Sequence, residues 1–275
     1  MTKLRREQIA GANYHYTRYP LSYFIGSMQK NGIHKIEFYA AAPHLYVFDY
    51  EPAEVKAIKK QLDAAQIDVI CFTAEQCFYP ISIAMDDSRV RERSIRYYER
   101  ALEQAAALEC PRMQMISGAG LCGSDPAEDW KRSADAIHQI VKKAESLGIT
   151  IVLEADYTCT VKSTADIRRM IDEIGSKNFS GMIDTNGLYY VKDGFEESVE
   201  LLGEDLRHFH FIDIRGDDGC LIPGDGDLPM DRYLDYLAAR GYEGYLTPEL
   251  WGGKYCDDPD AATKKCLEYC FRYTE

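Results

Sequence analysis

Short apolar stretches alternate with longer amphipathic stretches along the whole chain. Short apolar runs bounded by turn residues are typical of buried strands, and apolar positions three or four residues apart are typical of helices. The sequence therefore predicts eight strands, each followed by a helical or loop segment. In chain order these strands are QIAGANY, HKIEFYA, DVICFTA, RMQMISG, TIVLEAD, FSGMID, LRHFHFID and YEGYLTPEL.

The predicted helices carry start and stop signals. Asp125 or Ser124 precedes Pro126 at one start, and Ser163 or Thr164 opens another. A glycine follows several helical stretches, as expected where the last turn must reverse direction. The predicted helices are 51–65, 88–108, 126–147, 164–174 and 229–240, and the terminating glycines are Gly32, Gly148, Gly175 and Gly241.

Eight strand-then-helix units in 275 residues predict a (β/α)8 TIM barrel, an α/β fold. A doubly wound open sheet shows the same alternation and is the structural alternative. The count of eight favours the closed barrel, and no GxGxxG motif follows the first strand. Because no linker or low-complexity segment divides the chain, we expect one domain over residues 1–275.

The composition of the chain limits the classes of binding partner and the cellular compartment that we expect. A net charge of −13 without a Lys/Arg cluster argues against nucleic acid. No run approaches the ~18 apolar residues of a membrane span, so we expect no membrane partner and no signal peptide. Nine scattered cysteines, without a CxxC pair, favour a reducing cytoplasmic location. The sequence is compatible with a homo-oligomer.

Four polar side chains stand at or just after the ends of four successive strands in the C-terminal half. They are Glu154 in IVLEAD, Asp184 in GMIDTNG, His210 in HFHFID and Glu249 in YLTPEL. Placing such groups in apolar strands is costly without partners. In a barrel the C-terminal strand ends converge on one face, so a shared divalent cation is the simplest explanation. Three carboxylates and one imidazole suit Mn²⁺, Mg²⁺ or Co²⁺, with Zn²⁺ as an alternative.

Each of these side chains also has an ordinary structural interpretation. A single Asp or Glu at a strand end is commonly a helix cap or a surface group. His208 alternates with His210 along one strand and shares its facing. We interpret His208 as a packed histidine or one that supports a ligand.

These residues resemble the sugar phosphate isomerase/epimerase family with xylose-isomerase-like barrels. The segments that carry the resemblance are VLEAD, MIDTNG, HFHFID, IPGDGDLPM and GYEGYLTPEL. In the N-terminal half, IEFYAAAPH and TAEQCFYP are most similar to the fructoselysine 3-epimerases within that family. The resemblance covers nearly the whole chain.

The resemblance implies one divalent cation per chain held by Glu154, Asp184, His210 and Glu249, with Mn²⁺ favoured over Co²⁺, Mg²⁺, Ni²⁺ or Zn²⁺. It also implies that Glu154 and Glu249 act as the acid/base pair. The expected activity is a metal-dependent isomerase or 3-epimerase acting on a ketose or a fructosamine through a cis-enediolate. The expected partner is a small sugar or sugar conjugate.

The chain departs from tagatose-type epimerases at three positions that touch substrate in that group. Gly187 replaces a histidine, Thr160 replaces a glutamate, and Gly216 replaces an arginine, next to Arg215. These departures argue against a simple free hexulose as the substrate. The residues expected to line the substrate pocket are His44, Glu75, Tyr79, Asn186, Arg215, Tyr14 and Trp251.

Three other functions fit parts of the pattern. A dehydratase acting on an inosose or keto-sugar needs the same proton abstraction but then expels a hydroxyl. A non-catalytic sugar-binding barrel does not need both Glu154 and Glu249. A phosphodiesterase with a zinc cluster needs more ligands than six histidines, few at strand ends, supply, and the charge of −13 disfavours its substrate.

Overall fold

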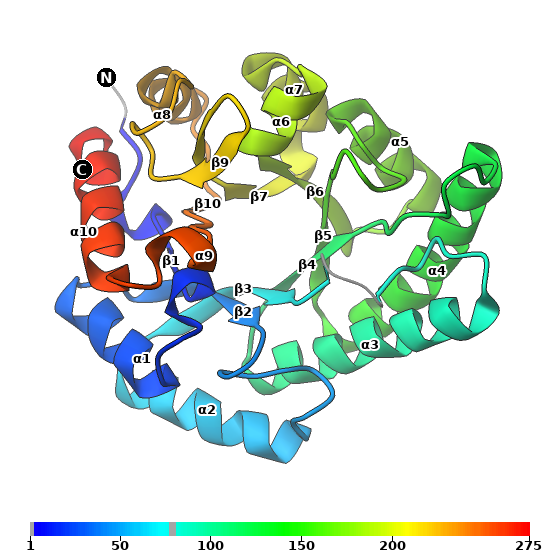
Figure 1. Cartoon of the computed structure of the whole chain (residues 1–275), viewed down its shortest axis with the longest axis horizontal. Helices are drawn as coiled ribbons and strands as arrows, with labels where there is room; N and C mark the ends of the chain where they lie inside the picture. The colour runs from blue at the N-terminus through cyan, green and yellow to red at the C-terminus, as the bar shows by residue number, and fades with distance from the viewer. Residues whose placement is uncertain (1–2, 77–80) are drawn as a thin grey trace.

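The computed structural model describes residues 3–76 and 81–275. Its main sheet has eight parallel strands in the order β1-β2-β3-β4-β5-β6-β7-β10, surrounded by helices (Figure 1). A parallel bridge between Ile9 and Leu246 brings the last strand to the first, and the N–H of Ala10 donates to the carbonyl of Leu246 at 2.9 Å. The (β/α)8 barrel is therefore confirmed, and the open sheet is excluded.

The strands of the barrel are short and begin close to the predicted positions. They are β1 (Gly11–Ala12), β2 (Lys35–Ala40), β3 (Asp68–Ala74), β4 (Arg112–Ile116), β5 (Thr150–Glu154), β6 (Phe179–Asp184), β7 (Leu206–His210) and β10 (Tyr245–Thr247). An antiparallel hairpin, β8 (Asp213–Arg215) with β9 (Asp218–Leu221), follows β7.

Helices lie on the outside of the barrel and in the loops above it (Figure 1). The α-helices of the described residues are α1 (Leu21–Lys30), α2 (Pro52–Ala64), α3 (Ser88–Ala107), α4 (Pro126–Leu147), α5 (Thr164–Ile174), α6 (Thr185–Val191), α7 (Phe195–Leu202), α8 (Met230–Ala239), α9 (Gly252–Tyr255) and α10 (Pro259–Cys270). Short 3-10 turns are η1 (Arg6–Gln8), η2 (Tyr14–Tyr16), η3 (Gly203–Asp205) and η4 (Phe271–Tyr273). None of the helices described is long and apolar enough to cross a bilayer.

Local sequence signals explain the helix ends that were predicted. Asp125 caps α4 by accepting a hydrogen bond from the N–H of Ala127, and Ser163 caps α5 by accepting one from the N–H of Asp166. At the other ends Gly148 and Gly175 adopt φ values of 69° and 64°, which glycine tolerates without a Cβ clash.

Two predicted strands are shorter than expected, and five helices lie outside the predicted helical ranges, namely α1, α6, α7, α9 and α10. The first strand is reduced to two residues because the chain turns into η2 at Tyr14. The last strand ends at Thr247, directly before Pro248, which has no N–H to continue the ladder. Glu249 therefore lies beyond the strand. Helices α6 and α7 were missed, since both are short and α6 starts at the strand end itself.

A small apolar layer lies beneath the polar strand ends. Val152 and Met182 precede Glu154 and Asp184 by two residues, so each shares the facing of its polar neighbour along the strand. Both are fully buried and pack in one cluster with Cys71 of β3. The much larger core packs the strands against the helices. The polar groups above thus have an apolar floor.

Candidate active site

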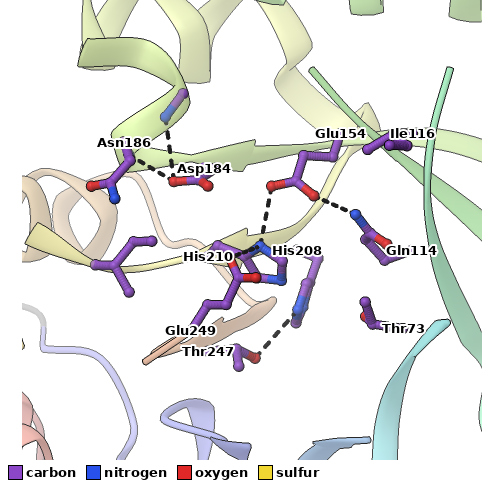
Figure 2. Close-up of polar contacts among 12 residues, drawn as sticks. Thr73, Gln114, Ile116, Glu154, Asp184, Asn186, His208, His210, Thr247 and Glu249 are labelled. Carbon is purple, nitrogen blue, oxygen red and sulfur yellow. Dashed lines mark hydrogen bonds and ion pairs between the residues drawn. The ribbon is translucent and has the colours of Figure 1, made fainter. Parts of the chain in front are cut away.

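Glu154, Asp184, His210 and Glu249 converge on one point at the C-terminal ends of the barrel strands. Each offers one ligand atom, and these atoms all lie within 4.8 Å of one another. His210 Nδ1 is 3.1 Å from a carboxylate oxygen of Glu154 and 3.1 Å from one of Glu249 (Figure 2). The His210 side chain is 1% exposed, whereas Glu154 and Glu249 are 12% and 21% exposed. The point where they meet is therefore reached from the mouth of the barrel.

The carboxylates of this cluster repel one another. Burial, together with the charges of Glu154 and Glu249, raises the pKa of Asp184 well above its usual range. Burial also raises the pKa of Glu249, with the charge of Glu154 adding to the effect and His210 opposing it. The repulsion among these carboxylates is relieved when a carboxyl group is protonated or when positive charge lies among them.

A divalent cation fits this set of ligands. Three hard oxygen donors and one imidazole suit Mn²⁺, Co²⁺, Mg²⁺ or Zn²⁺. Its charge would offset the repulsion that raises the pKa of Asp184. The four predicted ligands are thus brought together by strands β5, β6 and β7 and the segment after β10.

A fully buried carboxylate contacts the second nitrogen, Nε2, of the His210 ring. Glu37 Oε1, from β2, is 3.0 Å from His210 Nε2, and Glu37 Oε2 is 2.6 Å from His208 Nε2. Burial alone would raise the pKa of Glu37, but the two imidazoles outweigh it and hold that pKa well below its usual range. Tyr14 and Thr73 also donate hydrogen bonds to Glu37, at 2.8 and 2.6 Å. The imidazole is therefore oriented with Nδ1 toward the three carboxylates.

A chain of amide side chains fixes Glu154 from the side of β4. Gln114 donates a hydrogen bond to Glu154 Oε2 (Figure 2). Gln76 donates in turn to Gln114, and the hydroxyl of Tyr98 donates to Gln76 at 2.6 Å. Glu154 Oε1 faces His210. This arrangement leaves little freedom for the Glu154 carboxylate to rotate.

Asp184 caps a helix and also lies in the carboxylate cluster. It caps α6 by accepting hydrogen bonds from the N–H groups of Asn186 at 2.7 Å and Gly187 at 3.4 Å (Figure 2). The helix-cap interpretation and the ligand interpretation of this residue therefore both hold geometrically. The Asn186 side chain is buried beside Cys220 of β9.

Three of the residues predicted to bind substrate meet in one pocket. Tyr14, Glu75 and Trp251 line an open pocket of about 310 Å³ at the mouth of the barrel. The ring of Tyr14 meets that of His210 edge to face, with the centroids 6.1 Å apart, so this pocket adjoins the carboxylate cluster. Tyr79 lies outside the described residues.

Two other predicted residues are engaged elsewhere. His44 is buried, with Nδ1 2.8 Å from the Asn13 amide and Nε2 2.9 Å from the carbonyl of Tyr19, so both ring nitrogens have protein partners. The Arg215 guanidinium lies on the exposed hairpin, 3.4 Å from Asp227. Both remain predictions as substrate contacts.

Asp213 supports the turn that carries the PGDG motif. Its buried carboxylate accepts hydrogen bonds from the N–H groups of Ile214, Gly224, Gly226 and Leu228, at 2.8 to 3.1 Å. Gly224 has a φ of 90°, as expected for a turn that needs glycine. The final Asp of HFHFID thus holds the loop after the hairpin and not the cluster.

Glu37 and Gln114 were not selected from the sequence, although the same signal was present. Each is a polar residue inside an apolar strand, in KIEFYA and RMQMI, which is the pattern that selected the four clustered residues. Both lie before the strand end, so a search for polar residues at strand ends does not select them. Only the barrel register shows that they face the ligands.

Comparison with known proteins agrees with this geometry. The pattern of the xylose isomerase-like TIM barrel family matches residues 27–273. The chain belongs to this family. Its members among the relatives include the fructoselysine 3-epimerase of Escherichia coli O157:H7, which is 26% identical over 257 residues, or 92% of this chain and 93% of that protein.

One further relative and one solved structure broaden the comparison. The inosose dehydratase of Bacillus thuringiensis (strain Al Hakam) is 27% identical over 169 residues, 54% of this chain and 53% of that protein. The solved structure of the IOLI protein, which holds a zinc atom, superposes with a TM-score of 0.80 at 16% identity, covering 98% of this chain and 99% of that one. The latter likeness concerns the fold.

Proposed function

We propose that this protein is a divalent-metal-dependent 3-epimerase acting on a ketose or a fructosamine. Glu154 and Glu249 are the acid/base pair, and Asp184 and His210 complete the metal site. The observation that carries the proposal is that Glu154 and Glu249 approach the same His210 nitrogen, each at 3.1 Å, from β5 and from the segment after β10. Two carboxylates thus flank one point from different strands.

Mn²⁺ is the metal ion that we favour. When bound, it would polarise the carbonyl oxygen and the neighbouring hydroxyl oxygen of the sugar. Polarisation acidifies the carbon between those oxygens. Glu37 would keep the Nδ1 lone pair of His210 free by accepting a hydrogen bond from Nε2–H, which holds the ring proton on Nε2. The buried surroundings keep these charges effective, because the local dielectric is low.

In the proposed reaction, the side chains of the two glutamates carry out the proton transfer. One glutamate removes the proton from the acidified carbon and leaves a planar enediolate. The other glutamate returns a proton from the opposite face, which inverts the stereocentre. General acid/base help of this kind accelerates a reaction about 10²–10⁴-fold. Gln114 holds Glu154 in one orientation for this step.

A fructosamine is a better candidate than a simple free hexulose. The relative that matches 93% of its own length is a fructoselysine 3-epimerase. At the three positions where tagatose-type epimerases contact their sugar, this chain has Thr160, Gly187 and Gly216. The Thr160 hydroxyl donates a hydrogen bond to the carbonyl of Gly118 at 2.9 Å. These residues leave sugar recognition to other side chains.

A dehydratase is the second candidate, favoured by the match to an inosose dehydratase over half of the chain. It shares the first proton abstraction and then loses a β-hydroxyl as water. It therefore needs an acid beside the leaving hydroxyl and no proton return to the carbon. The shorter match ranks it behind the epimerase.

Incubation with sugars in D₂O tests the proposal and separates the two candidates. The Mn²⁺-loaded protein is mixed with D-fructose or Nε-fructosyl-lysine and followed by NMR. Deuterium at C3 with appearance of the C3 epimer supports the epimerase. An unsaturated or dicarbonyl product with loss of water would instead support the dehydratase. Absence of both exchange and elimination across ketoses and fructosamines would refute the proposed function and favour a sugar-binding barrel.

A further inference from the structure

The pocket beside the carboxylate cluster occupies the other half of the barrel mouth. We call it the mouth pocket, and its walls include Tyr14, Arg18, Tyr39, Glu75 and Trp251. These residues lie at or after the C-terminal ends of β1, β2, β3 and β10, whereas the clustered ligands come from the β5, β6, β7 and β10 ends. A volume of about 310 Å³ is enough for a short flexible group beyond a sugar.

Two aromatic residues of the mouth pocket, Tyr14 and Trp251, connect it to the clustered carboxylates, one by a ring contact and one by its place in the chain. Tyr14 donates its hydroxyl hydrogen bond to Glu37 at 2.8 Å and presents its ring to His210. Trp251 follows Glu249 by two residues in the chain. A substrate held at the clustered carboxylates would therefore extend between these two aromatic rings into the pocket.

The walls combine aromatic surface with two opposite charges. Tyr14 and Tyr39 stack with their centroids 4.4 Å apart, and Trp251 is 42% exposed. The Glu75 side chain is partly buried directly after β3. Arg18 is 71% exposed and pairs with Asp257 only at 4.0 Å, where Asp257 is 99% exposed. Such an exposed pair contributes little, so the guanidinium is available to an anion.

We propose that the mouth pocket binds the amino-acid tail of a fructosamine, with Arg18 as the residue that recognises the tail's carboxylate. This inference rests on the proposed function and names its substrate class more narrowly. Glu75 faces the cationic nitrogen of the tail, and the methylene groups lie against Tyr14, Tyr39 and Trp251. A guanidinium matches a carboxylate with two parallel hydrogen bonds.

Charge repulsion explains why the arginine lies in the mouth pocket and not among the clustered carboxylates. Glu154, Asp184 and Glu249 repel an anion, so a substrate carboxylate must be kept away from them and matched by a cation. Arg18 lines the mouth pocket and is not one of the clustered residues. A neutral free ketose has no group that uses either Arg18 or Glu75. The pocket therefore favours a zwitterionic conjugate.

Three probes and two substitutions of Arg18 test this inference on the Mn²⁺-loaded full chain. The probes are Nε-fructosyl-lysine, the fructosyl conjugate of cadaverine, which has the same methylene chain without the carboxylate, and D-fructose. Arg18→Gln should raise KM for fructosyl-lysine about 10- to 100-fold with kcat nearly unchanged, because a charge-assisted contact is lost. It should leave the other two probes unchanged. Arg18→Lys should restore part of the affinity.

A matched control separates a local effect from a change of surface charge. Arg232 is an arginine of α8, 68% exposed and paired with Glu196, and lies outside the pocket lining. Arg232→Gln should leave the KM of all three probes unchanged. Equal KM values of the wild type for the lysine and cadaverine conjugates, or an equal effect of Arg18→Gln on all three probes, would overturn the inference.

Binding distinguishes failure of this inference from failure of the proposed function. Calorimetry measures the affinity of the two fructosamines for wild type and Arg18→Gln without turnover. If no probe is turned over but fructosyl-lysine binds more tightly than the cadaverine conjugate in an Arg18-dependent way, the mouth pocket is supported and the epimerase is not. If D-fructose is epimerised while the two conjugates bind equally, the epimerase holds and the role of Arg18 is refuted.

Discussion

Glu37 Oε1 lies 3.0 Å from His210 Nε2, while the other nitrogen of the same ring lies 3.1 Å from Glu154 and 3.1 Å from Glu249. A buried carboxylate from β2 thus fixes the orientation of a histidine on β7, and with it the ring nitrogen that faces Glu154 and Glu249. Carboxylate partners of metal-bound histidines raise the basicity of the imidazole and hold its tautomer.

Replacing Glu37 should weaken metal binding. Glu37→Gln keeps the shape of the side chain but removes its charge, so the affinity for Mn²⁺ should fall about 10- to 100-fold. Titration calorimetry with Mn²⁺ measures this. Thr73→Val, which removes one hydrogen bond to the same carboxylate, should have a smaller effect. An unchanged affinity in folded Glu37→Gln would show that this residue only fills the barrel interior.

The residues of the site that could be predicted from the sequence are those that stand at strand ends. Glu154 and Asp184 interrupt apolar strands at their last residue, and barrel geometry alone places such residues together. Glu37 stands two residues into β2, where period-two alternation gives its facing but not its neighbours. Its contact with His210 spans 173 residues, which only the closed barrel establishes.

Loop residues were harder to place for a different reason. Arg18 follows a first strand of two residues and a 3-10 turn, a segment without periodicity. His44 follows a strand and matches a family segment, yet its two nitrogens are used by Asn13 and the carbonyl of Tyr19. In such segments the backbone path, and not the residue pattern, decides which side chains reach the pocket.

Chelation should remove activity and lower stability. Because the cation would offset the repulsion among three carboxylates, EDTA should inactivate the protein, and Mn²⁺ or Co²⁺ should restore it. At 100 times its Kd a bound ion stabilises a protein by about 2.7 kcal/mol, which corresponds to a rise in Tm of roughly 5–10 °C. Differential scanning calorimetry measures the shift. The double variant Asp184→Asn/His210→Gln should show no shift, and an equal shift in it would place the ion elsewhere.

His15 should make the protein less stable in mild acid. Burial lowers the pKa of His15 to about 3, although Asp260 opposes the effect. Because the folded pKa is below the unfolded value of about 6.5, this residue's contribution is complete above pH 6.5 and is lost as the pH falls toward 3. The slope from one such proton is about 1.4 kcal/mol per pH unit.

Urea unfolding between pH 7.5 and 4 isolates this contribution. In His15→Phe the free energy of unfolding should fall less steeply with decreasing pH than in the wild type. Thr263→Val removes the partner of His15 Nε2, which lies at 2.8 Å, and keeps the titrating ring. It should lower stability by about 1 kcal/mol at every pH without changing the slope. Parallel pH curves for wild type and His15→Phe would refute this role.

Asp213 should be a stability residue and not a catalytic one. Its carboxylate is fully buried and accepts four backbone hydrogen bonds around the PGDG turn. Asp213→Asn should lower the free energy of unfolding by about 2 kcal/mol, since hydrogen bonds to a charged acceptor are lost. Thermal unfolding measures this. The exposed neighbour substitution Asp227→Asn should change stability by less than about 0.5 kcal/mol. Equal effects would contradict the assignment.

The central claim is that Glu154 and Glu249 act on opposite faces of one carbon, and proton exchange by single variants tests it most directly. Glu154→Gln and Glu249→Gln, both saturated with Mn²⁺, are incubated in D₂O with each C3 epimer of the ketose or fructosamine that the wild type interconverts in the NMR experiment. We predict that both variants lose interconversion by at least about 10²-fold. We further predict that each retains deuterium exchange with only one epimer, and that the two variants retain opposite ones. Substantial interconversion by either folded variant, or exchange of the same epimer by both, would contradict the two-base account.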